Sequence, residues 1–90
     1  MQTLRLKVVN EVGLHARPAA MFVQAASGFQ ATIRARNATV TGDWVDAKSI
    51  LGVLTLGVEK DHEIEVDLDG PDEAPAAAAI QRLVESDFKS

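Results

Sequence analysis

Strict alternation of polar and apolar residues runs through the extended segments of this 90-residue chain. The segment Thr3–Val8 alternates at every position, and Glu63–Leu68 does the same. This period of two predicts strands with one buried face. A sheet with one solvated face is largely antiparallel and is covered on its other face only. The helices of the chain are therefore expected on a single side of the sheet.

The remaining patterns give the element order β-α-β-β-α-β-α. Ala31–Arg36 and Val40–Val45 are predicted to pair as a hairpin. Its turn lies within Asn37–Asp43, where Gly42-Asp43 is favoured as the tip but the sequence does not fix it. Helices are predicted from the turn at Pro18 to about Ser27, from near Ser49, and after Gly70-Pro71-Asp72.

Composition excludes several classes of function. The chain has no cysteine, which removes disulfides, thiolate metal sites and thiol catalysis. A formal net charge of −4 argues against a nucleic-acid partner. No apolar run approaches the roughly 20 residues needed to cross a bilayer, and the N-terminus lacks the pattern of a signal peptide. We expect a cytoplasmic protein with no membrane insertion, no cofactor and no metal.

The run Gly13-Leu14-His15-Ala16-Arg17-Pro18-Ala19 places a histidine and an arginine where a helix begins. Pro18 suits a first helical turn because it lacks an N–H and has a fixed φ. The unpaired N–H groups of Ala16 and Arg17 and the helix dipole favour an anion there, and a guanidinium matches phosphate geometry. Neutral imidazole is a nucleophile toward phosphorus. These residues predict a phosphoryl group held on His15.

The same run resembles the active-site sequence of the HPr family, the histidine phosphocarriers of the bacterial phosphotransferase system. A second run, Ala47–Gly57, resembles the family's other signature, around its regulatory serine, here Ser49. An isolated His-x-Arg triplet favours a helix cap beside a solvated charge, and the second motif reverses that preference. The resemblance covers residues 1–90 as a single HPr domain. It departs from the family at Arg36–Val45, which is a few residues longer.

The resemblance implies an α+β open-faced sandwich, in which a four-stranded antiparallel sheet carries three helices on one face. It also implies a monomeric carrier rather than an enzyme. Nδ1 of His15 would take a phosphoryl group from phosphorylated enzyme I and pass it to enzyme IIA domains for sugar uptake. Arg17 and the small Ala16 would complete this site.

Ser49 has two compatible interpretations. The residues alone predict a helix N-cap. The resemblance implies a regulatory phosphorylation site, with an HPr serine kinase/phosphorylase as a further partner. Two alternatives stay open. The first is a nitrogen-type phosphotransferase paralogue, because the histidine motif is common to both systems. The second is a regulatory interaction module acting mainly through Ser49; family paralogues of that kind lack the active histidine, so His15 argues against this role as the sole one. A self-contained phosphotransferase is disfavoured because the chain has no P-loop.

The second motif holds more apolar residues than one buried stripe of a two-turn helix accommodates. Some are therefore expected on the surface, unless neighbouring loops cover them. His62 stands among charges at a loop-to-strand junction and is also predicted at the surface. An exposed apolar patch on a small monomer marks an interaction surface, and we expect a partner-binding patch beside His15 formed by Ala20, Met21, Ile50, Leu51 and Leu54.

Overall fold

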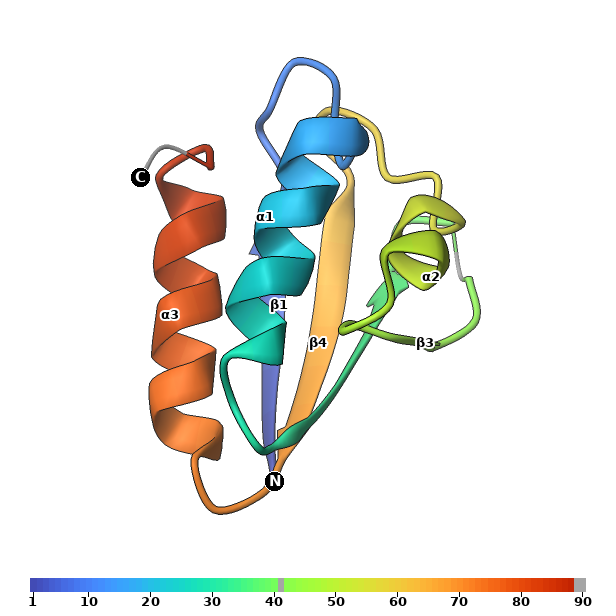
Figure 1. Ribbon diagram of the computed structural model, residues 1–90. Helices are drawn as coiled ribbons and strands as arrows, with labels where there is room; N and C mark the ends of the chain where they lie inside the picture. Colours follow the sequence, from blue (N-terminus) through green and yellow to red (C-terminus); the bar gives the residue numbers. More distant parts are fainter. Residues whose placement is uncertain (41, 89–90) are drawn as a thin grey trace.

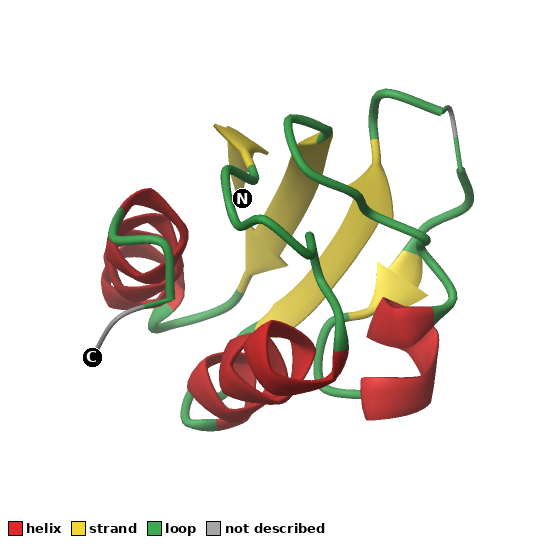
Figure 2. Ribbon diagram, turned by 90° about the horizontal axis from the view of Figure 1, so that it is seen from above, coloured by secondary structure: helices red, strands yellow, loops and turns green. Residues whose placement is uncertain are grey.

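A sheet forms one layer of the computed structural model and three helices form the other (Figure 1). The structure describes residues 1–40 and 42–88. All neighbouring strands are antiparallel, in the order β1-β4-β2-β3. Viewed from above, the helices all lie on the same side of the strands, which confirms the predicted fold class and element order (Figure 2). The elements are β1 Gln2–Lys7, α1 Ala16–Ser27, β2 Thr32–Asn37, β3 Val45–Asp46, α2 Ile50–Leu54, β4 Glu63–Asp69 and α3 Glu73–Glu85.

The core lies between the apolar face of the sheet and the helices. The interior strand β4 buries Ile64, Val66 and Leu68, and fully buried Phe22 of α1 and Ile80 of α3 belong to the same cluster. Complete burial of each such side chain stabilises the fold by roughly 1.5–3 kcal/mol. This packing holds α1 against the sheet, so that the position of its first turn is fixed.

The open face of the sheet carries charges of complementary sign. The acidic side chains of β4 lie between basic side chains of β1 and β2, which places opposite charges on neighbouring strands. Exposed ion pairs of this kind contribute little each. They match the observed register, because opposite charges face each other across the strands. The pairs are Arg5–Glu63, Arg34–Asp67 at 3.6 Å and Arg36–Glu65 at 2.7 Å.

The second hairpin differs from its prediction. Among the described residues of this segment, only Val45–Asp46 pairs with β2, whereas the prediction is a strand over Val40–Val45. The backbone N–H of Thr39 donates to Oδ1 of Asn37 at 3.1 Å, which turns the chain directly after β2. Trp44 then lies against the guanidinium groups of Arg34 and Arg36. Residue 41, within the predicted strand and turn, lies outside the described residues.

The loop before α1 touches the loop after α2 through backbone atoms. The N–H of Leu14 donates to the carbonyl of Val58 at 3.0 Å. Gly13 has φ +65°, and a Cβ built on it would lie 2.1 Å from that carbonyl oxygen. Only glycine permits both this conformation and this approach. The contact therefore fixes the residues just before His15 against a segment that is distant in sequence.

We expect Gly13→Ala to destabilise the protein more than Gly57→Ala. Both positions have positive φ, but a Cβ at Gly57 meets nothing within 4 Å. Gly57→Ala, the control, therefore measures only the cost of a positive φ at a residue with a Cβ, about 1–2 kcal/mol. Gly13→Ala adds the displacement of a backbone carbonyl to that cost. Urea unfolding of the two variants and the parent measures the difference. Equal losses of stability would show that the two loops separate at little cost.

Asp72, at the start of α3, connects that helix to the beginning of β2. Its two carboxylate oxygens each accept a backbone N–H at 2.8 Å, from Gln30 and Ala31. The hydrogen bond from Gln30, followed by that from Ala31, lowers the pKa of Asp72. A lowered pKa in the folded state means that the stabilisation is present above the ordinary aspartate value and is lost as pH falls through the folded value.

We expect Asp72→Asn to be less stable than the parent at pH 7, because an amide offers one acceptor oxygen in place of two. At a pH of about 2, below the ordinary aspartate pKa of about 3.9, we expect a smaller difference, because the parent has then lost most of the same contribution. Urea unfolding at both pH values measures this, with Asp43→Asn in an exposed loop as the control. A difference that stays constant with pH would contradict the role of the charged carboxylate.

Candidate functional site

His15 is the residue that immediately precedes α1. Its backbone is extended, with φ −86° and ψ −170°, and its carbonyl accepts the N–H of Ala19 at 2.8 Å. Its imidazole is exposed and makes no hydrogen bond with any described residue. The first N–H groups of a helix have no intrahelical acceptor. The imidazole of His15, without a hydrogen-bond partner among the described residues, therefore lies beside the backbone N–H groups of Ala16 and Arg17.

His15 borders two open hollows. Residues 57–60, more than forty positions away in the chain, contribute to both, and Glu59 lines each of them. The first hollow has a volume of about 380 Å³ and the second of about 450 Å³. The first is lined by Glu11, Val12, His15, Glu59 and Lys60, and the second by Leu14, His15, Leu54, Gly57, Val58 and Glu59.

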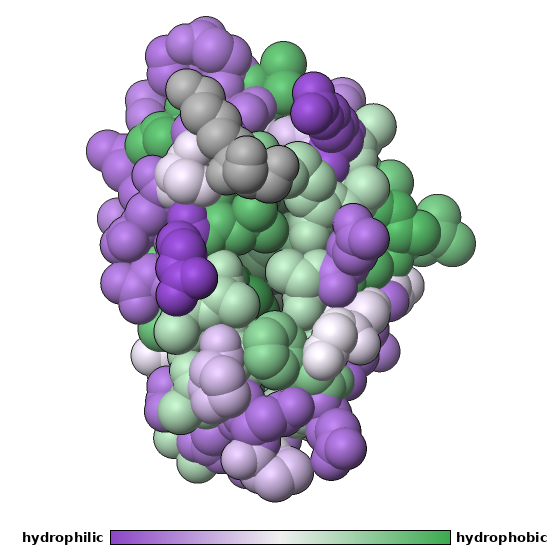
Figure 3. Space-filling view, turned by 60° about the vertical axis from the view of Figure 1, so that its left-hand side comes forward, coloured by the Kyte–Doolittle hydropathy of each residue, from purple (hydrophilic) through white to green (hydrophobic). Residues whose placement is uncertain are grey.

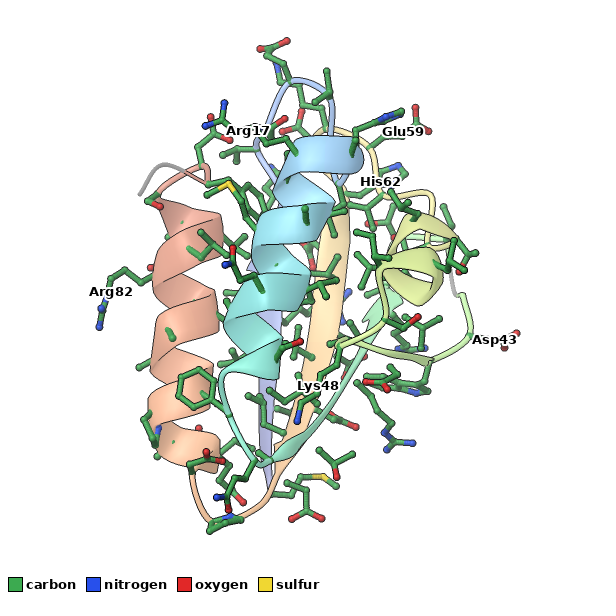
Figure 4. All side chains as sticks on the ribbon, in the orientation of Figure 1. Arg17, Asp43, Lys48, Glu59, His62 and Arg82 are labelled. Atoms are coloured by element: carbon green, nitrogen blue, oxygen red, sulfur yellow. The ribbon has the colours of Figure 1, made fainter. Side chains whose placement is uncertain are left out.

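Arg17 follows His15 by two residues but lines a different hollow. That hollow lies toward the C-terminal end of α3 and is also lined by Asp87 and Phe88. In Figure 4, Arg17 and Glu59 lie on opposite sides of the first turn of α1. Arg17 is exposed and forms no ion pair with the described residues. Its guanidinium is therefore free to rotate about the first turn.

Lys60 supplies the cation in the first hollow of His15. Its Nζ lies 3.0 Å from Oε1 of Glu11, and this hydrogen-bonded carboxylate raises the pKa of Lys60. Sequence reasoning missed Glu11, Glu59 and Lys60. Glu11 is close to the motif, but no spacing in the chain connects the motif with residues 59 and 60. Their approach to His15 results from the loop contact at Gly13.

His62, which was predicted at the surface, is half-buried and hydrogen-bonded. Its Nδ1 accepts the backbone N–H of Glu59 at 3.1 Å and lies 3.1 Å from Nδ2 of the buried Asn37. The backbone N–H of His62 also donates to the backbone carbonyl of Glu59 at 3.0 Å. The imidazole thus closes the turn that carries Glu59 and Lys60, and it connects this turn to the end of β2.

Ser49 is the N-cap of α2, as predicted. Its Oγ accepts the N–H of Gly52 at 3.2 Å. After it, Ile50 and Leu54 are partly exposed and Leu51 is 74% exposed, which shows that loops do not cover them.

The other predicted patch residues, in α1, differ from one another. Ala20 is exposed, whereas Met21 is half-buried and lines the hollow of Arg17. Leu54 lines a hollow of His15, so Met21 and Leu54 border different hollows. Figure 3 brings the α3 side forward and shows hydrophobic side chains gathered in the middle of that face, with hydrophilic ones around them.

Two structural features are absent from the described residues. None of their helices has the length and hydrophobicity required to span a membrane. Nor do they include a group of three or more histidine, aspartate or glutamate side chains placed to hold a metal ion.

Comparisons with known proteins agree over nearly the whole chain. A family model described as the PTS HPr component phosphorylation site matches residues 2–86. The phosphocarrier protein HPr of Treponema pallidum is 43% identical over 84 residues, covering 93% of this chain and 92% of that protein. A multiphosphoryl transfer protein of Vibrio cholerae is 42% identical over 81 residues, covering 90% of this chain but 20% of that longer protein.

Structural comparison gives the same result. The crystal structure of HPr-C-His from Thermoanaerobacter tengcongensis superposes with a TM-score of 0.91 and is 40% identical, covering 98% of this chain and 96% of that one. Fold, motifs and sequence similarity thus coincide, and the chain belongs to the HPr family of phosphotransferase-system phosphocarriers.

Proposed function

We propose that His15 is the residue that carries the phosphoryl group. The observation that supports this best is its exposed imidazole at the N-terminus of α1, which makes no hydrogen bond with the residues that the structure describes. The lone pair of Nδ1 forms the bond to phosphorus, while the bond between phosphorus and the donor atom breaks and its electron pair stays on the donor. The N–H groups of Ala16 and Arg17 then face the phosphoryl oxygens, and the guanidinium of Arg17 rotates toward them.

The donor in this proposal is phosphorylated enzyme I, and the acceptors are enzyme IIA domains of sugar uptake. The chain acts as a monomeric carrier in the cytoplasm and not as an enzyme, because each partner regenerates it for the other. Its membership of the HPr family and its similarity to a multiphosphoryl transfer protein support a place in a phosphoryl relay. The open hollows at His15 suit a group that must pass between successive partners.

Both partners would dock on the apolar residues beside His15. Ile50, Leu51 and Leu54 are exposed on α2, and Ala20 is exposed on α1. Burial of such side chains against a partner supplies a hydrophobic driving force without a deep cleft. Met21, which is half-buried, would contribute at the edge of this surface on the Arg17 side.

Ser49 would regulate docking. Its Oγ already accepts a backbone N–H at the start of α2. A phosphate there adds a charge of about −1.5 to −2 beside the exposed side chains of Ile50 and Leu51. An apolar surface must lose its water when it docks, and a nearby dianion opposes that loss. Phosphorylation is therefore expected to weaken docking while the fold is retained.

We expect His15→Ala to abolish phosphorylation. Incubation of the parent with enzyme I and phosphoenolpyruvate should add one phosphate, labile in acid and stable in base, because a phosphorus–nitrogen bond forms. Intact-mass measurement detects it, and peptide mapping distinguishes His15 from His62. A variant that is phosphorylated as well as the parent would contradict the assignment of His15.

We expect Ser49→Asp to slow the initial phosphorylation of His15 by enzyme I with a nearly unchanged melting temperature, since aspartate is also a good N-cap. Ser49→Ala is the matched control. It should transfer at the parent rate but lose about 1 kcal/mol of stability, because the cap is removed. Equal transfer rates for Ser49→Asp and the parent would disprove the coupling between Ser49 and docking.

A further inference from the structure

The cation that shares a hollow with His15 is Lys60 and not the arginine of the motif. Lys60 lines the hollow of about 380 Å³ in which His15 is exposed, while Arg17 lines the hollow beside α3. The other charged residues of the His15 hollow are Glu11 and Glu59. Two carboxylates beside an imidazole oppose the arrival of a phosphoryl group, because like charges repel at short range. Among the described residues that line this hollow, Lys60 carries the positive charge that offsets them.

The backbone that carries Lys60 is held on both sides. The N–H of Asp61 donates to the Val8 carbonyl at 2.7 Å, and Asp61 has a left-handed backbone with φ +71°. On the other side, Glu59 and His62 exchange two hydrogen bonds, one through the backbone and one through the His62 ring. A non-glycine residue with positive φ persists only where its surroundings hold it. The ammonium of Lys60 is thus presented from a fixed turn.

The present partner of Lys60 is easily replaced. Glu11 holds the ammonium at 3.0 Å from the facing loop, and its own side chain is 84% exposed. An exposed carboxylate regains water when it releases a cation, so the exchange costs little. A phosphoryl dianion carries more charge than a single carboxylate and offers three oxygens. It is therefore the stronger acceptor for the same ammonium.

We propose that Lys60 leaves Glu11 and binds the phosphoryl oxygens once His15 is phosphorylated. The ammonium keeps its protons throughout, and no covalent bond of Lys60 forms or breaks; only its hydrogen-bonded partner changes. The role of Lys60 is to stabilise the phosphorylated form relative to the free form. This inference rests on the proposed function, since it assigns a further phosphoryl-binding residue to the same site.

The experiment measures the equilibrium distribution of phosphoryl groups between enzyme I and this chain, because an equilibrium does not depend on the rate of docking. The variants are Lys60→Gln, Glu11→Gln and the control Lys7→Gln, which removes a positive charge from the open face of the sheet outside this hollow. We expect Lys60→Gln to reduce the ratio of phosphorylated to free chain about fivefold, as an exposed charge pair allows. Glu11→Gln should increase that ratio, and Lys7→Gln should leave it nearly unchanged.

A ³¹P NMR titration of the phosphorylated proteins gives a second readout. A nearby cation favours the dianion of the phosphoryl group over its monoanion. The pH midpoint of this titration should therefore be higher than in the parent for Lys60→Gln and lower for Glu11→Gln. If the Lys60–Glu11 ion pair only stabilised the loops, both variants would shift the titration midpoint in the same direction. Shifts of the same sign, or a Lys60→Gln variant that matches Lys7→Gln, would overturn the role of Lys60. Absence of phosphate on the parent would instead overturn the proposed function itself.

Discussion

The site depends on one backbone contact between two loops. Gly13 lies so close to the Val58 carbonyl that a methyl group does not fit, and the N–H of Leu14 bonds to the same oxygen. This contact brings His15 beside Glu59 and Lys60, although they are far apart in the chain. The burial of the apolar side of α1 in the core fixes one loop, and the His62 turn fixes the other. The surroundings of the imidazole are therefore set by backbone geometry, which is less adaptable than side-chain packing.

The one-sided sheet explains why this site is open. The helices cover one face only, and the loops next to the start of α1 lie beyond one end of the strands, where Glu11, His15, Glu59 and Lys60 are exposed to solvent (Figure 1). The same arrangement leaves Ile50, Leu51 and Leu54 of the short helix α2 partly or largely exposed. A carrier needs these properties, since one group must fit two different partners in turn. An enclosed cleft would exclude partner proteins from the reacting nitrogen.

Charge is distributed differently on the two sides of the molecule. On the open sheet face, Arg34 and Arg36 face carboxylates of β4, so that their charges are balanced within the fold. At the helix end, the carboxylate of Glu11 is 84% exposed, against 17% for Asp67 and 23% for Glu65, and its ion pair with Lys60 connects two loops rather than two strands. Exposed pairs exchange partners readily because water stabilises the released group. The ion pairs on the open sheet face match the strand register, whereas the pair at the helix end leaves the charge of Lys60 available for an incoming anion.

The sequence by itself determined the strands β1, β2 and β4, the order of elements, the start of α1 directly after His15 and the cap at Ser49. These features depend on local periodicity, on proline and on side chains that bond to nearby amides. It did not determine the short second hairpin, where the Asn37 side chain turns the chain and Trp44 lies against two arginines. Nor did it indicate that Arg17 and His15 border different hollows, or that Lys60 joins His15. Those arrangements were decided by the tertiary structure, because they depend on which segments far apart in the chain come into contact. The residue pattern within one segment carries no information about the segment that it will contact.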